Sequence, residues 1–384
     1  MKTSEAPQPF AIAVHEEILE DLSHRLAQTR WTDEIPDSGW TYGANLSYMK
    51  ELIAYWKDAY DWRKQEKILN SSPQYTVQID DIQLHYLHVP GKGPDPMPLI
   101  LSHGWPGSFT EFTKIIGPLT DPAAYGGDPK DAFTVVAPSL PGYGFSHVAN
   151  QRRLSAEEMV DMFHHLMTET LGYANFIAQG GDWGGLLTSI LGYKYPENVV
   201  GIHLNMIATA PDQSDIGDIS PAEMAFFQKM EEFKDEAGYT QIQGTKPQTL
   251  GYGLNDSPVG LAAWITEKFY TWTDSHGDIE SSLSKDDLLN NIMIYWVTQT
   301  IQSSFWLYYN SRHDAWKLPK GEKITVPTAV GSFPAEISRP PREWVERTCN
   351  VTHWTDMESG GHFAALEKPD LLAEDLRGFL RTLK

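Results

Sequence analysis

One short motif limits the folds open to this chain. The sequence Gly-Gly-Asp-Trp-Gly-Gly occupies residues 180–185, after a short apolar run at Asn175–Ala178 and at the start of a helical pattern at Gly184–Lys194. Glycines let the backbone crowd closely where a strand turns sharply into a helix, and such a turn lifts its central residue clear of the sheet. The motif therefore predicts that Asp182 is presented as a nucleophile. The alternative is a glycine-rich turn in which Asp182 only caps the helix.

Short strands and helices alternate around this motif, in residues 75–205. Apolar runs at Pro98–Leu101, Phe133–Ala137 and Val199–Leu204 end in loops, and Ser155 begins a helix with acidic residues in its first turn. Alternation of this kind is typical of a parallel sheet covered by helices on both faces. We therefore predict an α/β fold with a mostly parallel central sheet.

The rest of the chain divides into three further regions. Residues 1–74 are predicted to form an N-terminal helical meander that serves as a packing module. Residues 206–318 are aromatic-rich and break the alternation, so they are predicted to be a helical lid inserted over the carboxyl ends of the strands, where ligands bind in open α/β sheets. Residues 319–384 complete the core, with strands at Thr325–Val330 and Val351–Thr355 and a final helix at Leu371–Leu383.

A second glycine-rich loop follows the strand that begins at Pro98. It reads His-Gly-Trp-Pro-Gly at residues 103–107. In a strand–loop arrangement of this kind, one backbone N–H of an oxyanion hole comes from this loop and the other from the residue after the nucleophile. Those donors would be Trp105 and Trp183, and a cis bond between Trp105 and Pro106 would fit the turn. The alternative is an ordinary Gly/Pro turn.

A base and an acid are expected after the last two strands. The loop Ser-Gly-Gly-His-Phe at residues 359–363 places His362 where it can reach across the strand ends, a setting that the other histidines of the chain lack. Glu336 follows the preceding strand and is the predicted acid that orients His362. Asp356 and Glu358 are alternatives on the histidine loop itself. The chain order Asp182, Glu336, His362 matches the nucleophile–acid–histidine order of this architecture.

An aspartate nucleophile restricts the reaction. A carboxylate that displaces a leaving group from an sp³ carbon gives an alkyl ester, whose carbonyl activated water can then attack. Serine would give an ether with no such carbonyl, so esterase, lipase and peptidase activities are disfavoured. An epoxide oxygen leaves as an alkoxide and needs a proton donor, which tyrosine, with an ordinary pKa of about 10, can be. A halide needs only N–H donors.

Composition excludes several other classes. The formal net charge of −21 and the lack of basic runs argue against a nucleic-acid partner. The single cysteine, Cys349, excludes an internal disulfide and a thiolate metal cluster, and we expect no cofactor or metal. No run approaches the ~18 apolar residues of a membrane span, and no signal-peptide pattern is present. We expect a cytoplasmic protein without a membrane anchor; assembly into a homo-oligomer is left open.

These motifs together resemble the microsomal type of epoxide hydrolase, in particular its soluble fungal and bacterial members. The resemblance covers almost the whole chain. It rests on the loop at 103–107, the elbow at 180–185, Phe-Pro-Ala-Glu at 333–336, Gly-Gly-His-Phe-Ala-Ala at 360–365 and N-terminal motifs that include Tyr-Asp-Trp-Arg at 60–63. It implies an α/β-hydrolase fold, hydrolysis of an apolar epoxide with water as co-substrate, and an N-terminal region that wraps the lid.

The resemblance also implies two lid tyrosines that activate the epoxide. By their spacing from neighbouring motifs these look like Tyr239 and Tyr308, with Tyr252 and Tyr309 as competing neighbours. The membrane anchor of the mammalian members has no counterpart here. Two other functions stay open at this point: a haloalkane dehalogenase, which would share the Asp182–Trp183 elbow, and a ligand-binding protein of the same fold that has lost catalysis.

Overall fold

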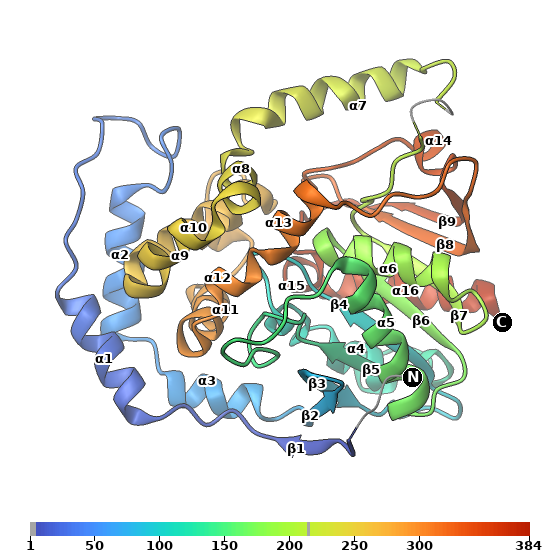
Figure 1. The fold of residues 1–384 in the computed structure, drawn as a ribbon, viewed down its shortest axis with the longest axis horizontal. Helices are drawn as coiled ribbons and strands as arrows, with labels where there is room; N and C mark the ends of the chain where they lie inside the picture. Colours follow the sequence, from blue (N-terminus) through green and yellow to red (C-terminus); the bar gives the residue numbers. More distant parts are fainter. Residues whose placement is uncertain (1–4, 213–215) are drawn as a thin grey trace.

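The computed structural model describes residues 5–212 and 216–384 and contains one mixed sheet (Figure 1). The strand order is β1-β2-β3-β5-β4-β6-β7-β8-β9. β1, β2, β3 and β5 pair antiparallel, whereas the ladder from β5 through β4, β6, β7 and β8 to β9 is parallel. The strands are Gln8–Phe10, Gln74–Ile79, Ile82–Val89, Met97–Ser102, Phe133–Pro138, Phe176–Gly180, Val199–Leu204, Ile324–Ser332 and Cys349–Asp356. The predicted α/β fold is confirmed.

Helices cover both faces of the parallel strands. A Cβ at Gly192 in α6 would touch the side chain of Ile202 in β7. A Cβ at Gly201, the residue before Ile202 in that strand, would touch Phe379 of α16. Because successive strand residues point to opposite faces, α6 and α16 lie on opposite sides of the sheet. α5 packs on α6 and α4 on α16. The core helices are α4 (Ile116–Thr120), α5 (Ala156–His165), α6 (Asp182–Lys194), α14 (Arg342–Val345), α15 (Ala364–Glu367) and α16 (Pro369–Leu383).

Local signals explain where several of these elements begin. Ser155 caps α5 through a capping box with Glu158, as the predicted helix start requires. α6 begins at Asp182, two residues before the predicted start, and the extended Gly181 is its N-cap. The Trp105–Pro106 peptide bond is cis, the form that was considered to fit this turn.

The chain segment that connects β7 to β8 forms a layer of helices, and this layer covers the carboxyl ends of the parallel strands (Figure 1). Within it, α8 packs on α13, α9 on α12, and α10 on α9 and α11. Among the described helices, none combines the length and apolarity needed to cross a bilayer. The helices of this layer are α7 (Pro221–Glu232), α8 (Gly238–Thr245), α9 (Pro247–Asp256), α10 (Pro258–Trp272), α11 (Lys285–Thr298), α12 (Ile301–Ser304) and α13 (Trp306–His313).

The N-terminal helices α1 (Glu16–Ala27), α2 (Leu46–Asp58) and α3 (Trp62–Leu69) lie against these lid helices. Tyr55 and Gln65 both donate hydrogen bonds to the Asp286 carboxylate, each at 2.8 Å. Tyr60 donates to Asn290 at 2.7 Å. The predicted N-terminal helical region contains these three helices and also the strand β1 (Gln8–Phe10), which was not predicted. That segment pairs with β2, a long-range contact that helical periodicity cannot reveal.

Asp375 ties α16 to two strands and makes stability depend on pH. Its carboxylate accepts hydrogen bonds from His203 (2.8 Å), His353 (2.7 Å) and Thr355 (2.5 Å). Burial alone would raise the pKa of Asp375, but these bonds hold it at about 2. The ionised carboxylate therefore contributes stability that is complete above its unfolded pKa of about 4 and is lost as the pH falls through about 2.

We accordingly predict that Asp375→Asn lowers the free energy of unfolding by about 2 kcal/mol at neutral pH. The variant should also lose part of the pH dependence of stability between about pH 4 and 2. Urea unfolding at a series of pH values measures both effects. Equal stability of the variant and the parent at neutral pH would contradict the prediction.

Candidate active site

The elbow holds Asp182 in a strained conformation. Asp182 has φ +51°, a left-handed value that costs free energy for a residue with a side chain. The turn leaves no room for side chains at its flanks, because a Cβ at Gly184 would lie 1.9 Å from the carbonyl oxygen of Ser102. The glycines thus let β6 turn directly into α6 beside β4. The Asp182 carboxyl stands at the start of α6, where the positive end of the helix dipole favours a negative charge.

The loop at 103–107 supplies a donor to this carboxylate. The backbone N–H of Trp105 donates to Asp182 Oδ1 at 2.8 Å. Gly104 permits this approach, because a Cβ there would lie 2.2 Å from Oδ1. Trp183 lies in the first turn of α6, whose N–H groups have no acceptor within the helix and are available to an oxyanion.

Helix α11 of the lid forms hydrogen bonds to the loop at 103–107. Asn291 Nδ2 donates to the carbonyl oxygen of Pro106 at 2.7 Å, and the Tyr295 hydroxyl donates to that of Gly107, also at 2.7 Å. All of these groups are buried. The loop at 103–107 is therefore held by the lid as well as by the sheet, which keeps the Trp105 N–H directed at Asp182.

His362 lies between two carboxylates. Its Nδ1 donates to Glu336 Oε1 at 2.8 Å, and its Nε2 lies 3.5 Å from Asp182 Oδ2. A β-bridge between Ala335 and Gly361 brings the Glu336 loop and the His362 loop together. The backbone N–H of His362 donates to the backbone carbonyl oxygen of Trp272 in the lid. Asp356 and Glu358, the alternative acids, are both exposed. The structure thus brings Glu336, and neither alternative, into contact with His362.

This setting determines the charge of the imidazole. Burial alone would lower the pKa of His362, but the charges and hydrogen bonds of Glu336 and Asp182 outweigh it and raise the pKa well above its usual value. The two carboxylates therefore favour the protonated imidazole. Without the charge of Asp182, the pKa of His362 would be lower.

We predict that Asp182→Asn, which imitates this loss of charge, lowers the pKa of His362. The variant removes one of the two carboxylates that raise that pKa, so the imidazole should lose its proton at a lower pH than in the parent. Titration of the His362 ring by NMR measures the shift, with the exposed His313 as an internal control. An unchanged pKa would show that the Asp182 charge does not control the base.

The tyrosines Tyr239 (α8) and Tyr308 (α13) face each other above Asp182. Their ring centroids are 5.7 Å apart; Trp105 stacks on Tyr239 at 5.3 Å and Trp183 packs edge-on against Tyr308 at 4.8 Å. Burial first, and the nearby Asp182 charge among the further causes, raise the pKa of both hydroxyls. Both therefore keep their protons at neutral pH and can donate hydrogen bonds.

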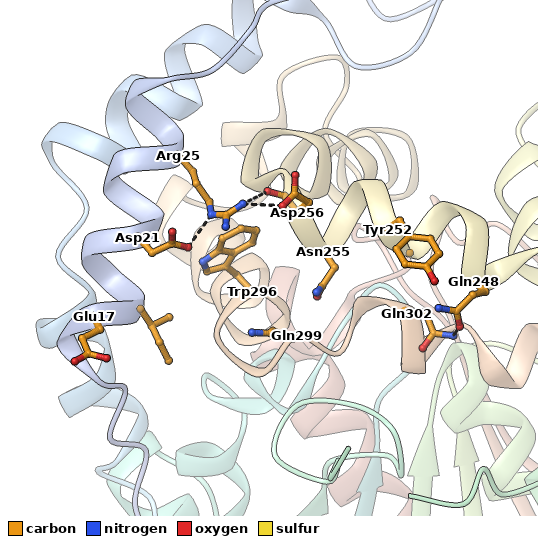
Figure 2. A pocket seen from close by; sticks show the side chains of 12 residues that line it. Glu17, Asp21, Arg25, Gln248, Tyr252, Asn255, Asp256, Trp296, Gln299 and Gln302 are labelled. Carbon is orange, nitrogen blue, oxygen red and sulfur yellow. Dashed lines mark hydrogen bonds and ion pairs between the residues drawn. The ribbon is translucent and has the colours of Figure 1, made fainter. Parts of the chain in front are cut away.

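The two competing tyrosines lie elsewhere. Tyr309 stacks on Trp306 and His313 on the side of α13 away from Tyr308. Tyr252 is 73% exposed and lines a separate groove of about 630 Å³ between α1 and the lid, where Arg25 pairs with Asp21 and Asp256 (Figure 2). The structure therefore brings Tyr239 and Tyr308 to Asp182 and leaves these two outside.

Two residues beside Asp182 and His362 were not predicted from the sequence. Trp272 packs against the His362 ring with centroids 5.0 Å apart. Glu111 is half-buried and lies close enough for the charges of His362 and Asp182 to affect its pKa. Trp272 is one of many lid aromatics, and Glu111 reads as a surface carboxylate in a short helical turn. The only signal for Glu111 was its place four residues after Gly107.

Comparison with known proteins agrees with this geometry. Residues 7–112 match the family model described as epoxide hydrolase N terminus, and residues 97–244 match the alpha/beta hydrolase fold. A putative epoxide hydrolase of Stigmatella aurantiaca is 42% identical over 98% of this chain and 85% of its own. Epoxide hydrolase 1 of Sus scrofa is 37% identical over 99% of this chain and 90% of its own.

Solved structures of similar proteins extend the agreement to three dimensions. Juvenile hormone epoxide hydrolase from the silkworm Bombyx mori superimposes with a TM-score of 0.89 at 31% identity, covering 98% of this chain and 95% of the other. Epoxide hydrolase from Aspergillus niger gives a TM-score of 0.85 at 30% identity, covering 99% and 97%. The chain therefore belongs to the epoxide hydrolase family and has the α/β-hydrolase fold.

Proposed function

We propose that this protein hydrolyses an epoxide to a vicinal diol through a covalent ester on Asp182. The observation that carries the proposal is the contact of one carboxylate with both an oxyanion-hole donor and the base: Asp182 Oδ1 accepts from the Trp105 N–H, while Oδ2 lies 3.5 Å from His362 Nε2. Oδ2 is thus the oxygen left to attack carbon, and Oδ1 is already where a later oxyanion would be stabilised.

In the first step Asp182 Oδ2 attacks an epoxide carbon, and the bond from that carbon to the ring oxygen breaks. The ring oxygen takes a proton from Tyr239 or Tyr308, whose hydroxyls stay protonated until then. The tyrosine regains a proton from the His362 imidazolium, which leaves His362 neutral. In the second step His362 takes a proton from water, and the hydroxide adds to the ester carbonyl. The Trp105 and Trp183 N–H groups stabilise the oxyanion, which collapses as the bond to the diol oxygen breaks, and that oxygen takes the proton from His362. The second proton of the water passes from the Asp182 carboxyl to His362, which restores both groups.

The substrate class follows from the side chains around the carboxylate. Aromatic rings surround the carboxylate: those of Trp105, Trp183, Trp272, Tyr239 and Tyr308. Among the described residues, His362 is the only basic side chain in contact with Asp182. Such walls suit an apolar epoxide, with polar contacts confined to the ring oxygen. We place this activity in the cytoplasm, because the single cysteine is typical of a reducing compartment.

A matched pair of substrates tests the function against its nearest alternative. An aryl or alkyl epoxide and the haloalkane of the same carbon skeleton should be supplied to the same enzyme preparation. We expect diol from the epoxide and slow or no halide release, because two tyrosine hydroxyls suit an alkoxide leaving group. Faster halide release than diol formation would make the protein a dehalogenase, and turnover of neither substrate would support a binding role.

A further inference from the structure

A small cavity lies behind the Asp182–His362 pair. Its walls include Ser102, Glu111, Gln179, Asp182, Asn205 and His362, and the volume open to the centre of a water molecule is about 20 Å³. That is enough for one water and too little for a substrate carbon skeleton. The cavity therefore adjoins both catalytic groups without being the place where the epoxide binds.

Polar groups line this cavity. Ser102 Oγ and Gln179 Oε1 are buried and have no hydrogen-bond partner within the described part of the chain. The Glu111 carboxyl likewise accepts no hydrogen bond from the side chains and backbone that the structure describes. Buried polar groups are nearly always paired with protein or with an ordered water. Their convergence on a space for one water indicates a water site.

Glu111 reaches the cavity because of a glycine. It belongs to a single 3-10 turn, Phe109–Phe112, whose neighbours Phe109 and Phe112 are buried. A Cβ at Gly107 would lie 1.4 Å from Glu111 Oε1, so any larger residue there would displace the carboxyl. The loop that carries the Trp105 donor thus also makes room for Glu111 beside the nucleophile.

We propose that this cavity binds the water that hydrolyses the ester, and that Glu111 orients it. The inference rests on the proposed ester mechanism. One O–H of the water donates to Glu111 and the other to His362 Nε2, which leaves an oxygen lone pair to face the carbonyl carbon of esterified Asp182. His362 takes its proton, the water oxygen bonds to that carbon, and the bond to the diol oxygen breaks. The diol oxygen then receives the proton from His362.

The charges of both neighbours reach Glu111. Burial raises the pKa of Glu111 to about 8; the His362 charge lowers that pKa, and the Asp182 charge adds to the rise. In either protonation state a carboxyl oxygen of Glu111 can accept a hydrogen bond from the water.

Single-turnover kinetics of Glu111→Gln and Glu111→Leu test the proposal. The parent and each variant are mixed, in excess, with an aryl epoxide. The reaction is quenched at a series of times, and the intact mass of the protein shows how much ester is present. Ester formation should stay close to the parent rate, since Asp182 attacks without water. Ester decay should slow by about 10- to 100-fold in Glu111→Leu and less in Glu111→Gln, whose amide oxygen still accepts a hydrogen bond. Thr113→Ala, an exposed change just after the same turn, is the matched control.

The outcomes separate this role from a structural one. A merely structural loss would slow formation and decay together, and that result would overturn the proposal, as would decay at the parent rate. If Glu111→Leu does not fold, Glu111→Gln decides: decay slowed more than formation supports the proposal, and any other result overturns it. If the parent itself forms no ester, the proposed mechanism has failed, and the Glu111 proposal falls with it for that separate reason.

Discussion

His362→Gln should leave the enzyme trapped as its alkyl ester. Asp182 needs no base to attack an epoxide, so ester formation should stay close to the parent rate. Hydrolysis of that ester requires a proton acceptor on water, and loss of such a group typically costs about 10²–10⁴-fold. Intact-mass measurement should therefore show a protein heavier by one epoxide, which accumulates within a single turnover and decays slowly.

The exposed His313 offers a matched control, because His313→Gln changes a lid histidine without contact to Asp182. That variant should turn over like the parent and show no added mass. If His362→Gln instead blocked ester formation while the protein stayed folded, the imidazole would act in the first step, and the assignment of His362 as the base for hydrolysis would be wrong.

The double variant Tyr239→Phe/Tyr308→Phe should nearly abolish ester formation with epoxides. Both hydroxyls keep their protons because burial and the Asp182 charge raise their pKa values, and loss of general-acid help is worth about 10²–10⁴-fold. Either donor can partly replace the other, so each single variant should show a smaller effect. Phenylalanine keeps the ring contacts with Trp105 and Trp183, so the loss of packing should be small.

Tyr252→Phe/Tyr309→Phe is the matched control, since it removes two lid hydroxyls that do not face Asp182. The pre-steady-state rate of ester formation is the quantity to compare. Parent-like formation in the Tyr239/Tyr308 double variant would remove these hydroxyls from the mechanism. Equal losses in both double variants would show that the effect comes from the lid's structure and not from proton donation.

Much of the fold was predictable because its signals are local. The apolar runs at Phe133–Ala137 and Val199–Leu204 became β5 and β7 with bounds that agree within one residue, since parallel strands buried on both faces are continuous apolar stretches. Ser155 with Glu158 marks a helix start in four residues. β1 escaped prediction because the strand it pairs with, β2, lies more than sixty residues away in the chain.

The candidate site divides in the same way. Asp182, Glu336 and His362 each follow a strand, so the strand order alone predicts that they gather at one edge of the sheet, and the structure brings them together. Tyr239 and Tyr308 depend on how α8 and α13 rotate in the lid, which no local pattern specifies, so only the family resemblance could suggest them. Glu111 depends on the exact room that Gly107 leaves, which is a matter of tertiary packing. The roles of these residues, and the division of the chain at residues 74, 205 and 318, stay predictions.

The central claim is that Asp182 bonds to the substrate. If Asp182 Oδ2 attacks carbon, the oxygen added to the diol in the first turnover comes from the enzyme and not from solvent. In heavy-oxygen water, a single turnover with excess enzyme should give unlabelled diol, and mass spectrometry of the peptide that contains Asp182 should find the label in its carboxylate. Labelled diol with an unlabelled Asp182 peptide would mean direct attack by water on the epoxide and would contradict the account.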